Sequence, residues 1–166
     1  RFTIFNAGKA DIFGAELYIW WRPTAGLDLK LGASHIDSNV NAGLGLTQFT
    51  RANSPNTPGL TYNFLGRYQW LIKSGAQAFV QFDTAFQDQV YFSLDNAKAV
   101  SEEAFSISNF RFGLELTETP WSLSIWIKNL NNREYFTEIL SSNSAGAVSA
   151  QIGPPRTFGV TLDYRH

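Results

Sequence analysis

The sequence predicts an all-β protein: an antiparallel transmembrane β-barrel, with about seven strands here forming an arc of its wall. Apolar and polar residues alternate with period two in nearly every strand-like segment, so each strand has one apolar and one polar face. Short turns and long loops alternate between consecutive strands. Charged residues make up only 16% of the 166 residues while aromatic residues reach 15%, a balance that suits a surface in contact with lipid.

The first two strands are expected over residues 10–22 and 27–36. Residues 23–26 between them read Pro-Thr-Ala-Gly, a tight-turn sequence, because proline presets φ and glycine accepts a positive φ. Residues 37–58 are rich in Asn, Gly, Thr and Pro and are expected to form a long loop. The apolar face of these two strands consists of Ala15, Leu17, Ile19, Trp21, Leu27, Leu29, Leu31 and Ala33.

The third and fourth strands are expected over residues 60–71 and 77–92, joined by a tight turn at residues 73–75. Their apolar and polar positions alternate as in the first pair. A polar loop follows at residues 94–104. The apolar positions of the two strands include Leu60, Tyr62, Phe64, Tyr68, Trp70, Ala78, Val80, Phe82 and Phe86.

The last three strands are expected over residues 109–116, 121–128 and 158–166. Residues 117–120 form a short turn, and residues 137–150 form a third long loop rich in Ser, Asn, Gly and Ala. Pro154 and Pro155 cannot donate a ladder hydrogen bond, so they should precede the paired part of the last strand. The apolar positions are Phe110, Phe112, Leu114, Leu116, Trp121, Leu123, Ile125, Ile127, Phe158, Val160, Leu162 and Tyr164.

This pattern places all short turns at one end of the sheet and all long loops at the other, because consecutive strands are antiparallel. That asymmetry is typical of bacterial outer-membrane barrels. A soluble antiparallel sandwich is the first alternative, but several strands exceed the ~5–6 residues usual in globular proteins. Seven antiparallel strands cannot close a barrel, which favours an arc of a larger wall. A small, complete eight-stranded barrel with a structural or adhesive role stays open as the second alternative.

Other function classes lack the residues they need. The net charge of −1 offers no obvious electrostatic partner for nucleic acid. The two histidines, His35 and His166, are far apart without a ligand pattern, and there is no cysteine, so no metal site is expected. Neither a nucleophile elbow nor a dinucleotide fingerprint occurs. We therefore expect a protein that is not an enzyme and has no cofactor.

Three motifs resemble those of TonB-dependent outer-membrane receptors. The first is Asn6-Ala-Gly-Lys-Ala-Asp-Ile-Phe-Gly-Ala-Glu-Leu17. The second is Lys128-Asn-Leu-Asn-Asn-Arg-Glu-Tyr135, and the third is Gly153-Pro-Pro-Arg-Thr-Phe-Gly-Val-Thr-Leu-Asp-Tyr-Arg165. They stand in the order and at the spacing of the late strands of those receptors, so the resemblance covers essentially all 166 residues. The family usually ends in Phe or Tyr, whereas this sequence ends in His166.

The resemblance implies that residues 1–166 form one segment, the C-terminal part of the receptor's barrel, with the family's plug domain absent from it. The implied function is active transport of a scarce, bulky solute across the bacterial outer membrane. A ferric siderophore is the commonest cargo, with cobalamin or an oligosaccharide as competitors. The implied partners are outer-membrane lipid, the solute, and TonB through the missing N-terminal region.

Solute contacts within this segment are expected on the long loops, because loops at a barrel mouth can vary without disturbing the wall. The main loop cations are Arg51 and Lys98, and Phe49 is a loop aromatic. For an anionic ferric chelate, Arg51 is the candidate ligand-binding residue. The alternative is an arginine that is merely solvated.

Overall fold

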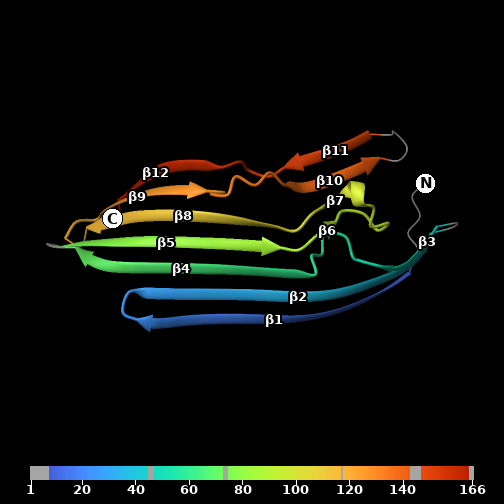
Figure 1. The fold of residues 1–166 in the computed structure, drawn as a ribbon, viewed down its shortest axis with the longest axis horizontal. Coiled ribbons are helices and arrows are strands. Elements are labelled where there is room, and N and C mark those ends of the chain that lie inside the picture. Colours follow the sequence, from blue (N-terminus) through green and yellow to red (C-terminus); the bar gives the residue numbers. More distant parts are fainter. Residues whose placement is uncertain (1–7, 45–46, 73–74, 117, 143–146, 165–166) are drawn as a thin grey trace.

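The fold is one antiparallel sheet, seen in a computed structural model that describes residues 8–44, 47–72, 75–116, 118–142 and 147–164 (Figure 1). Each strand pairs with the next along the chain, apart from short strands set off the main row. One of these, β3 (Thr47–Ala52), pairs with β2 alone. The main row consists of β1 (Gly8–Thr24), β2 (Leu27–Leu44), β4 (Leu60–Ile72), β5 (Ala76–Gln87), β8 (Phe105–Leu116), β9 (Trp121–Lys128) and β12 (Thr157–Tyr164).

The remaining elements gather at one end of the sheet, opposite the tight turns (Figure 1). β6 (Val90–Tyr91) pairs with β7 (Ser101–Glu102), and a 3₁₀ turn, η1 (Lys98–Val100), precedes β7. β10 (Phe136–Ser142) and β11 (Ala147–Ile152) form a hairpin. The predicted asymmetry between short-turn and loop ends is therefore confirmed. No helix in the described part of the chain is long and apolar enough to cross a membrane.

The strand register collects the predicted apolar residues on one face of the sheet. Phe82 lies opposite Phe110, Phe110 opposite Ile127, and Ile127 opposite Phe158, so one apolar row crosses four strands. These side chains are not buried in a core, since Ile125 is 52% exposed and Phe158 82% exposed. The sandwich alternative requires them to be covered and is wrong.

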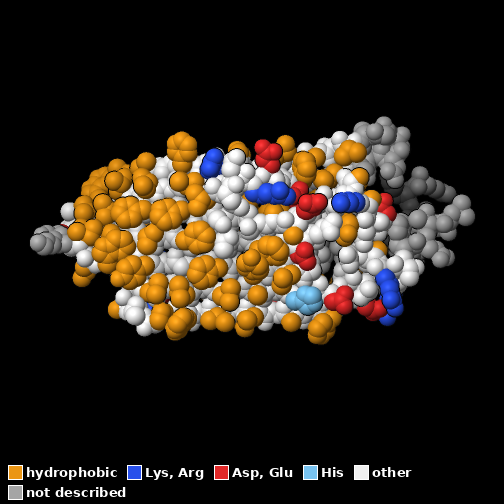
Figure 2. All heavy atoms as spheres, in the orientation of Figure 1, with side chains coloured by type: hydrophobic (Ala, Val, Ile, Leu, Met, Phe, Trp, Pro, Cys, Tyr) orange, Lys and Arg blue, Asp and Glu red, His pale blue; other side chains and the backbone are white. Residues whose placement is uncertain are grey.

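This apolar face occupies the part of the sheet nearest the short turns. Figure 2 shows the face of the molecule on which hydrophobic side chains cover that part, whereas charged side chains appear toward the loop end. Near the short turns, the Trp121 and Tyr164 rings lie 4.8 Å apart and the Tyr68 and Trp70 rings 5.5 Å apart. Aromatic rings at this level are typical of the interface between hydrocarbon and water.

The first tight turn requires a glycine. β1 continues to Thr24, so only Ala25 and Gly26 lie between the strands. Gly26 has a φ of 93°, and a Cβ there would stand 2.3 Å from the Gln69 carbonyl oxygen. The Gln69 N–H donates to the Gly26 carbonyl at 2.8 Å, which ties the turn to β4. β12 begins at Thr157, so Pro154 and Pro155 precede the ladder as predicted.

The prediction was wrong for two of the three long loops. Much of 37–58 is strand, since β2 continues to Leu44 and β3 follows, and most of 137–150 is the β10–β11 hairpin. The expected strand over 77–92 ends at Gln87, although the Asp88 N–H still donates to the Leu60 carbonyl of β4 at 2.8 Å. Strands that extend beyond a membrane contact water on both faces. They therefore need no alternation of apolar and polar residues, and their sequence pattern does not distinguish them from loops.

The sheet is open at both sides within the described residues. β1 pairs only with β2, and β12 pairs only with β9. A complete eight-stranded barrel needs the first and last strands to meet, so the open sides favour an arc of a larger wall.

Candidate binding site at the loop end

The face opposite the apolar one carries charged groups that pair with each other across strands. Arg67 on β4 forms an ion pair with Glu115 on β8 at 3.0 Å. Arg111 on β8 donates two hydrogen bonds to the Ser124 hydroxyl at 3.0 and 2.8 Å. A lipid-facing arginine would cost ~2–4 kcal/mol at mid-bilayer, so this polar face is the one suited to a barrel interior.

Large rings on the polar face lie flat over glycines of the neighbouring strand. A Cβ at Gly159 would stand 2.4 Å from the Trp126 ring, and one at Gly113 would stand 2.3 Å from the Phe79 ring. The Trp126 indole N–H donates to the Thr161 hydroxyl at 3.0 Å. Gly159 therefore allows the Trp126 ring to approach the backbone of the neighbouring strand closely.

A buried carboxylate at the end of β7 fastens this strand to the start of β10. Glu102 is 5% exposed, and one of its oxygens lies 2.9 Å from the Arg133 guanidinium. The other oxygen accepts a hydrogen bond from the Phe136 backbone N–H at 2.9 Å. Both carboxylate oxygens are thus used, and two chain segments about thirty residues apart are held together. Sequence reasoning missed this contact.

A second clamp joins the loop after β3 to the loop after β6. The Asn53 N–H donates to the Asn96 side-chain oxygen at 2.7 Å, and the Asn96 amide donates back to the Asn53 carbonyl at 3.0 Å. The Asn56 N–H donates to the Tyr91 carbonyl at 2.8 Å. In the same loop, a hydrogen bond from the Ser93 hydroxyl lowers the pKa of Asp95, and the Ala97 N–H adds to the effect.

The Asn129 side chain connects the second and third motifs by hydrogen bonds. Its side-chain oxygen accepts the Arg133 N–H at 2.9 Å, and its amide donates to the carbonyls of Arg133 at 2.8 Å and Pro154 at 3.2 Å. Asn129 is 3% exposed and has a φ of 51°, a conformation that asparagine tolerates better than most residues. One side chain therefore ties the turn after β9 to the segment that enters β12.

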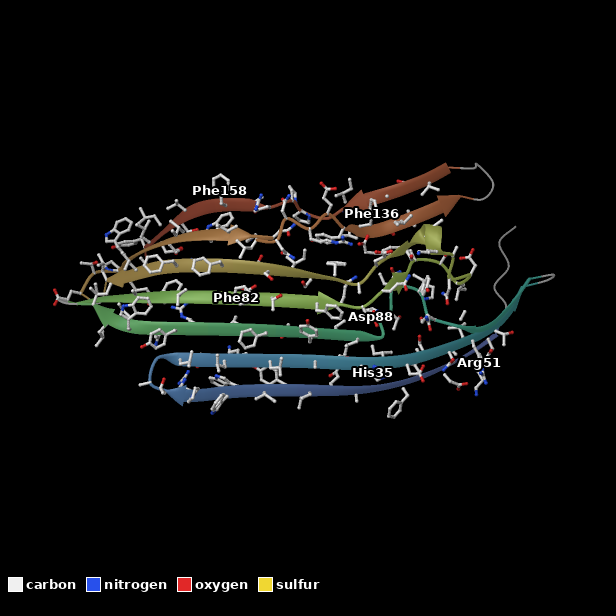
Figure 3. All side chains as sticks on the ribbon, viewed as in Figure 1. His35, Arg51, Phe82, Asp88, Phe136 and Phe158 are labelled. Carbon is white, nitrogen blue, oxygen red and sulfur yellow. The ribbon has the colours of Figure 1, made fainter. Side chains whose placement is uncertain are left out.

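The predicted ligand residue, Arg51, lies on β3 at the far loop end of the molecule (Figure 3). It is exposed, has a φ of 55°, and its backbone N–H donates to the Asn41 side chain at 3.1 Å. Its side chain makes no ion pair within the described residues, and the other loop cation, Lys98, begins η1. The Phe49 side chain and His166 lie outside what the structure describes.

His35 lies on the apolar face, directly opposite Ala15 and Leu60 of the flanking strands (Figure 3). Within the described residues, no group of three or more His, Cys, Asp or Glu side chains could hold a metal ion.

Three loop segments converge on a pocket of about 270 Å³ at this end of the sheet. Gln87 at the end of β5 and Phe105 at the start of β8 lie opposite each other on the polar face and line it. Phe92 and Phe136 also line the pocket, as does Tyr135, whose ring centroid lies 4.6 Å from that of Phe105. Figure 3 shows Phe136 at the start of β10.

The antiparallel order, the apolar outer face and the polar face with its internal ion pairs define a segment of a transmembrane β-barrel wall. The solved structures that it resembles are siderophore receptors, each much longer than this chain. Over 95% of its length the chain matches the ferric yersiniabactin uptake receptor FyuA from Yersinia pestis, with a TM-score of 0.82 and 24% identity. It matches the siderophore receptor PiuA from Acinetobacter baumannii over 93% of its length, with a TM-score of 0.75 and 17% identity.

A third match is BauA, the ferric preacinetobactin receptor from Acinetobacter baumannii, with a TM-score of 0.73 and 15% identity over 95% of the chain. The chain spans 24% of FyuA and 22% of each of the other two receptors. No protein-family model and no curated protein sequence matches the chain. The predicted fold, an antiparallel sheet that forms part of the wall of a transmembrane β-barrel, is confirmed.

Proposed function

We propose that this chain is the C-terminal part of the barrel of a bacterial outer-membrane receptor that imports a scarce, bulky solute. The observation that carries the proposal is the continuous antiparallel sheet with one exposed apolar face, which matches a ferric siderophore uptake receptor over 95% of its length. The three sequence motifs support the same receptor class and the C-terminal position. In this proposal residues 1–166 are one segment of the wall, and the receptor's plug lies elsewhere in the parent protein.

The proposed cargo is a ferric siderophore, and transport is coupled to TonB through a part of the parent protein outside this chain. Three receptors with this fold are named for siderophores or their ferric complexes, which supports that class of cargo. The protein acts as a receptor and not as an enzyme. Its apolar face contacts outer-membrane lipid, and its loop end faces the cell exterior.

Uptake in a strain that lacks the parent gene tests the proposal. Cells deprived of iron are given ⁵⁵Fe complexes of several siderophore classes, and uptake is compared with the wild type and with the complemented strain. We expect loss of uptake for at least one ferric siderophore and its recovery on complementation. Unchanged import of all of them, and of cobalamin and oligosaccharides, would contradict the transport function.

A further inference from the structure

Arg156 is an exposed cation at the point where the apolar face of β12 begins. It follows Pro154 and Pro155 and stands two positions before Phe158, which is 82% exposed on the apolar face. Alternate residues of an extended chain point to the same side, so Arg156 belongs to the side of the sheet that carries Phe158. Figure 2 shows Lys and Arg side chains on this face, just beyond the part that hydrophobic side chains cover.

Counted from the short turns, Arg156 stands near the far border of the apolar band. Tyr164 of β12 lies opposite Trp121, and their rings are 4.8 Å apart at the short-turn end. Arg156 precedes Tyr164 by eight residues, which span ~27 Å along a strand, or ~20 Å along the membrane normal at a tilt of ~40°. In an apolar band ~25 Å tall that begins at Tyr164, the backbone of Arg156 lies ~5 Å below the outer interface. The long side chain can extend its guanidinium across that distance into the headgroup layer.

The Arg156 guanidinium makes no ion pair within the described residues. Arg133, in the segment that leads to β10, differs in this respect, because its guanidinium lies 2.9 Å from the buried Glu102 carboxylate. Both backbone segments are held by Asn129, whose amide donates to the carbonyls of Arg133 and Pro154. Asn129 and the two prolines fix the backbone in front of Arg156, so less conformational entropy is lost when its side chain binds a partner.

Phosphate is the group that such an arginine would meet at this depth. Lipid headgroups carry phosphate, and a planar guanidinium donates two parallel hydrogen bonds to it. Phe158 and Val160, the next positions on the same face, are exposed and suit the acyl chains below that headgroup. Elsewhere on this face, Asp88 stands two positions beyond Phe86 at the end of β5 and would repel a phosphate (Figure 3). Charge therefore favours the β12 side of the wall for an anionic headgroup.

We propose that Arg156 binds a phosphate group of an outer-leaflet lipid, whose acyl chains lie against the apolar face of β12. The inference rests on the proposed function for the placement of the loop end at the outer leaflet, but the lipid is bound without any solute. Arg156→Ala removes the charge, whereas Arg156→Lys keeps the charge and loses the second parallel hydrogen bond. Arg156→Gln keeps most of the side-chain length and repeats the test if the alanine variant does not fold.

The matched control is Lys128→Ala. Lys128 lies opposite Thr157, the residue next to Arg156, but on the polar face. Its substitution removes the same charge from the other side of the wall.

The experiment uses the full-length receptor purified in detergent and counts bound lipid by native mass spectrometry. The probes are diphosphorylated lipid A, the same lipid with both phosphates removed, and inorganic phosphate as a competitor. We expect Arg156→Ala to weaken binding of diphosphorylated lipid A about fivefold and to leave binding of the phosphate-free lipid unchanged. Arg156→Lys should lie between the wild type and Arg156→Ala, and Lys128→Ala should match the wild type. Inorganic phosphate should not displace the lipid. A gel-mobility assay of unheated samples verifies that each variant is folded.

Three outcomes would overturn the inference: equal affinity of the wild type and Arg156→Ala for diphosphorylated lipid A, an equal loss in Lys128→Ala, or displacement of the lipid by inorganic phosphate. Each of them leaves the transport proposal standing, because solute uptake is measured separately. If the lipid binds as expected while the uptake assay finds no transported solute, the lipid site is supported and the transport function is contradicted.

Discussion

Substitution of Ile125 by arginine tests which face of the sheet meets lipid. Ile125 is 52% exposed on the apolar face of β9, four residues beyond Trp121. Four residues advance ~14 Å along a strand, or ~10 Å along the membrane normal at a tilt of ~40°. If Trp121 marks the interface of an apolar band ~25 Å tall, Ile125 lies close to the midplane.

At that depth an arginine costs ~2–4 kcal/mol in folding free energy, and the cost falls to ~0–1 kcal/mol near the interfaces. A polar-face control is Ser122→Arg, nearer the Trp121 end of the same strand and directly opposite Asp163 of β12. There the new guanidinium can pair with a carboxylate, so we expect a change of less than ~1 kcal/mol.

Both variants are made in the full-length receptor, folded into lipid vesicles and titrated with urea. The folded fraction is read from the mobility of unheated samples on gels. A loss of less than ~1 kcal/mol for Ile125→Arg, or an equal loss for Ser122→Arg, would refute the assignment of the apolar face to lipid.

Two further predictions test single contacts, and a third tests the loop cation Arg51. Gly159→Ala should cost ~1–3 kcal/mol in folding free energy, because its Cβ would collide with Trp126. The same substitution should cost almost nothing in a Trp126→Ala background. Equal losses of folding free energy in both backgrounds would contradict the contact. Glu102→Gln should cost roughly 1–3 kcal/mol and speed amide hydrogen exchange at Phe136; unchanged exchange there would contradict the clamp. Arg51→Ala should weaken binding of an anionic ferric chelate up to about fivefold at low salt without changing the amount of folded receptor, and unchanged affinity would remove Arg51 from the site.

The membrane-spanning part of the fold could be predicted from the sequence because one face of each strand is apolar there. Val80, Phe112 and Ile125 were assigned to the apolar face by alternation alone, and the register places them in one row. The hairpin of β10 and β11 could not be predicted in this way, since strands that are wet on both faces carry no period-two signal. The alternation therefore predicted the membrane-spanning strands but not the strands that extend beyond them.

Less of the candidate site could be predicted from the sequence. Arg51 stands out as a loop cation, yet its role as a ligand stays a prediction. Glu102 and Arg133 are separated by thirty-one positions, and nothing in either local sequence indicates their pairing. The pocket walls likewise come from segments that meet only in the folded sheet. Asn129 belongs to the second motif, and its hydrogen bonds give a structural reason for an asparagine at that position.

The two open sides of the sheet determine how this stretch of chain can be handled in isolation. On β1 and β12, one row of backbone N–H and C=O groups has no strand partner within the described residues. Such groups cost several kcal/mol each in hydrocarbon, so a separately expressed fragment would satisfy them by joining edge to edge with its own copies. The same two edges are templates for a second polypeptide that carries the rest of the wall. In the proposed receptor, a cut in the chain before β1 should therefore still allow assembly from two polypeptides, each pairing with the open strand edges of the other.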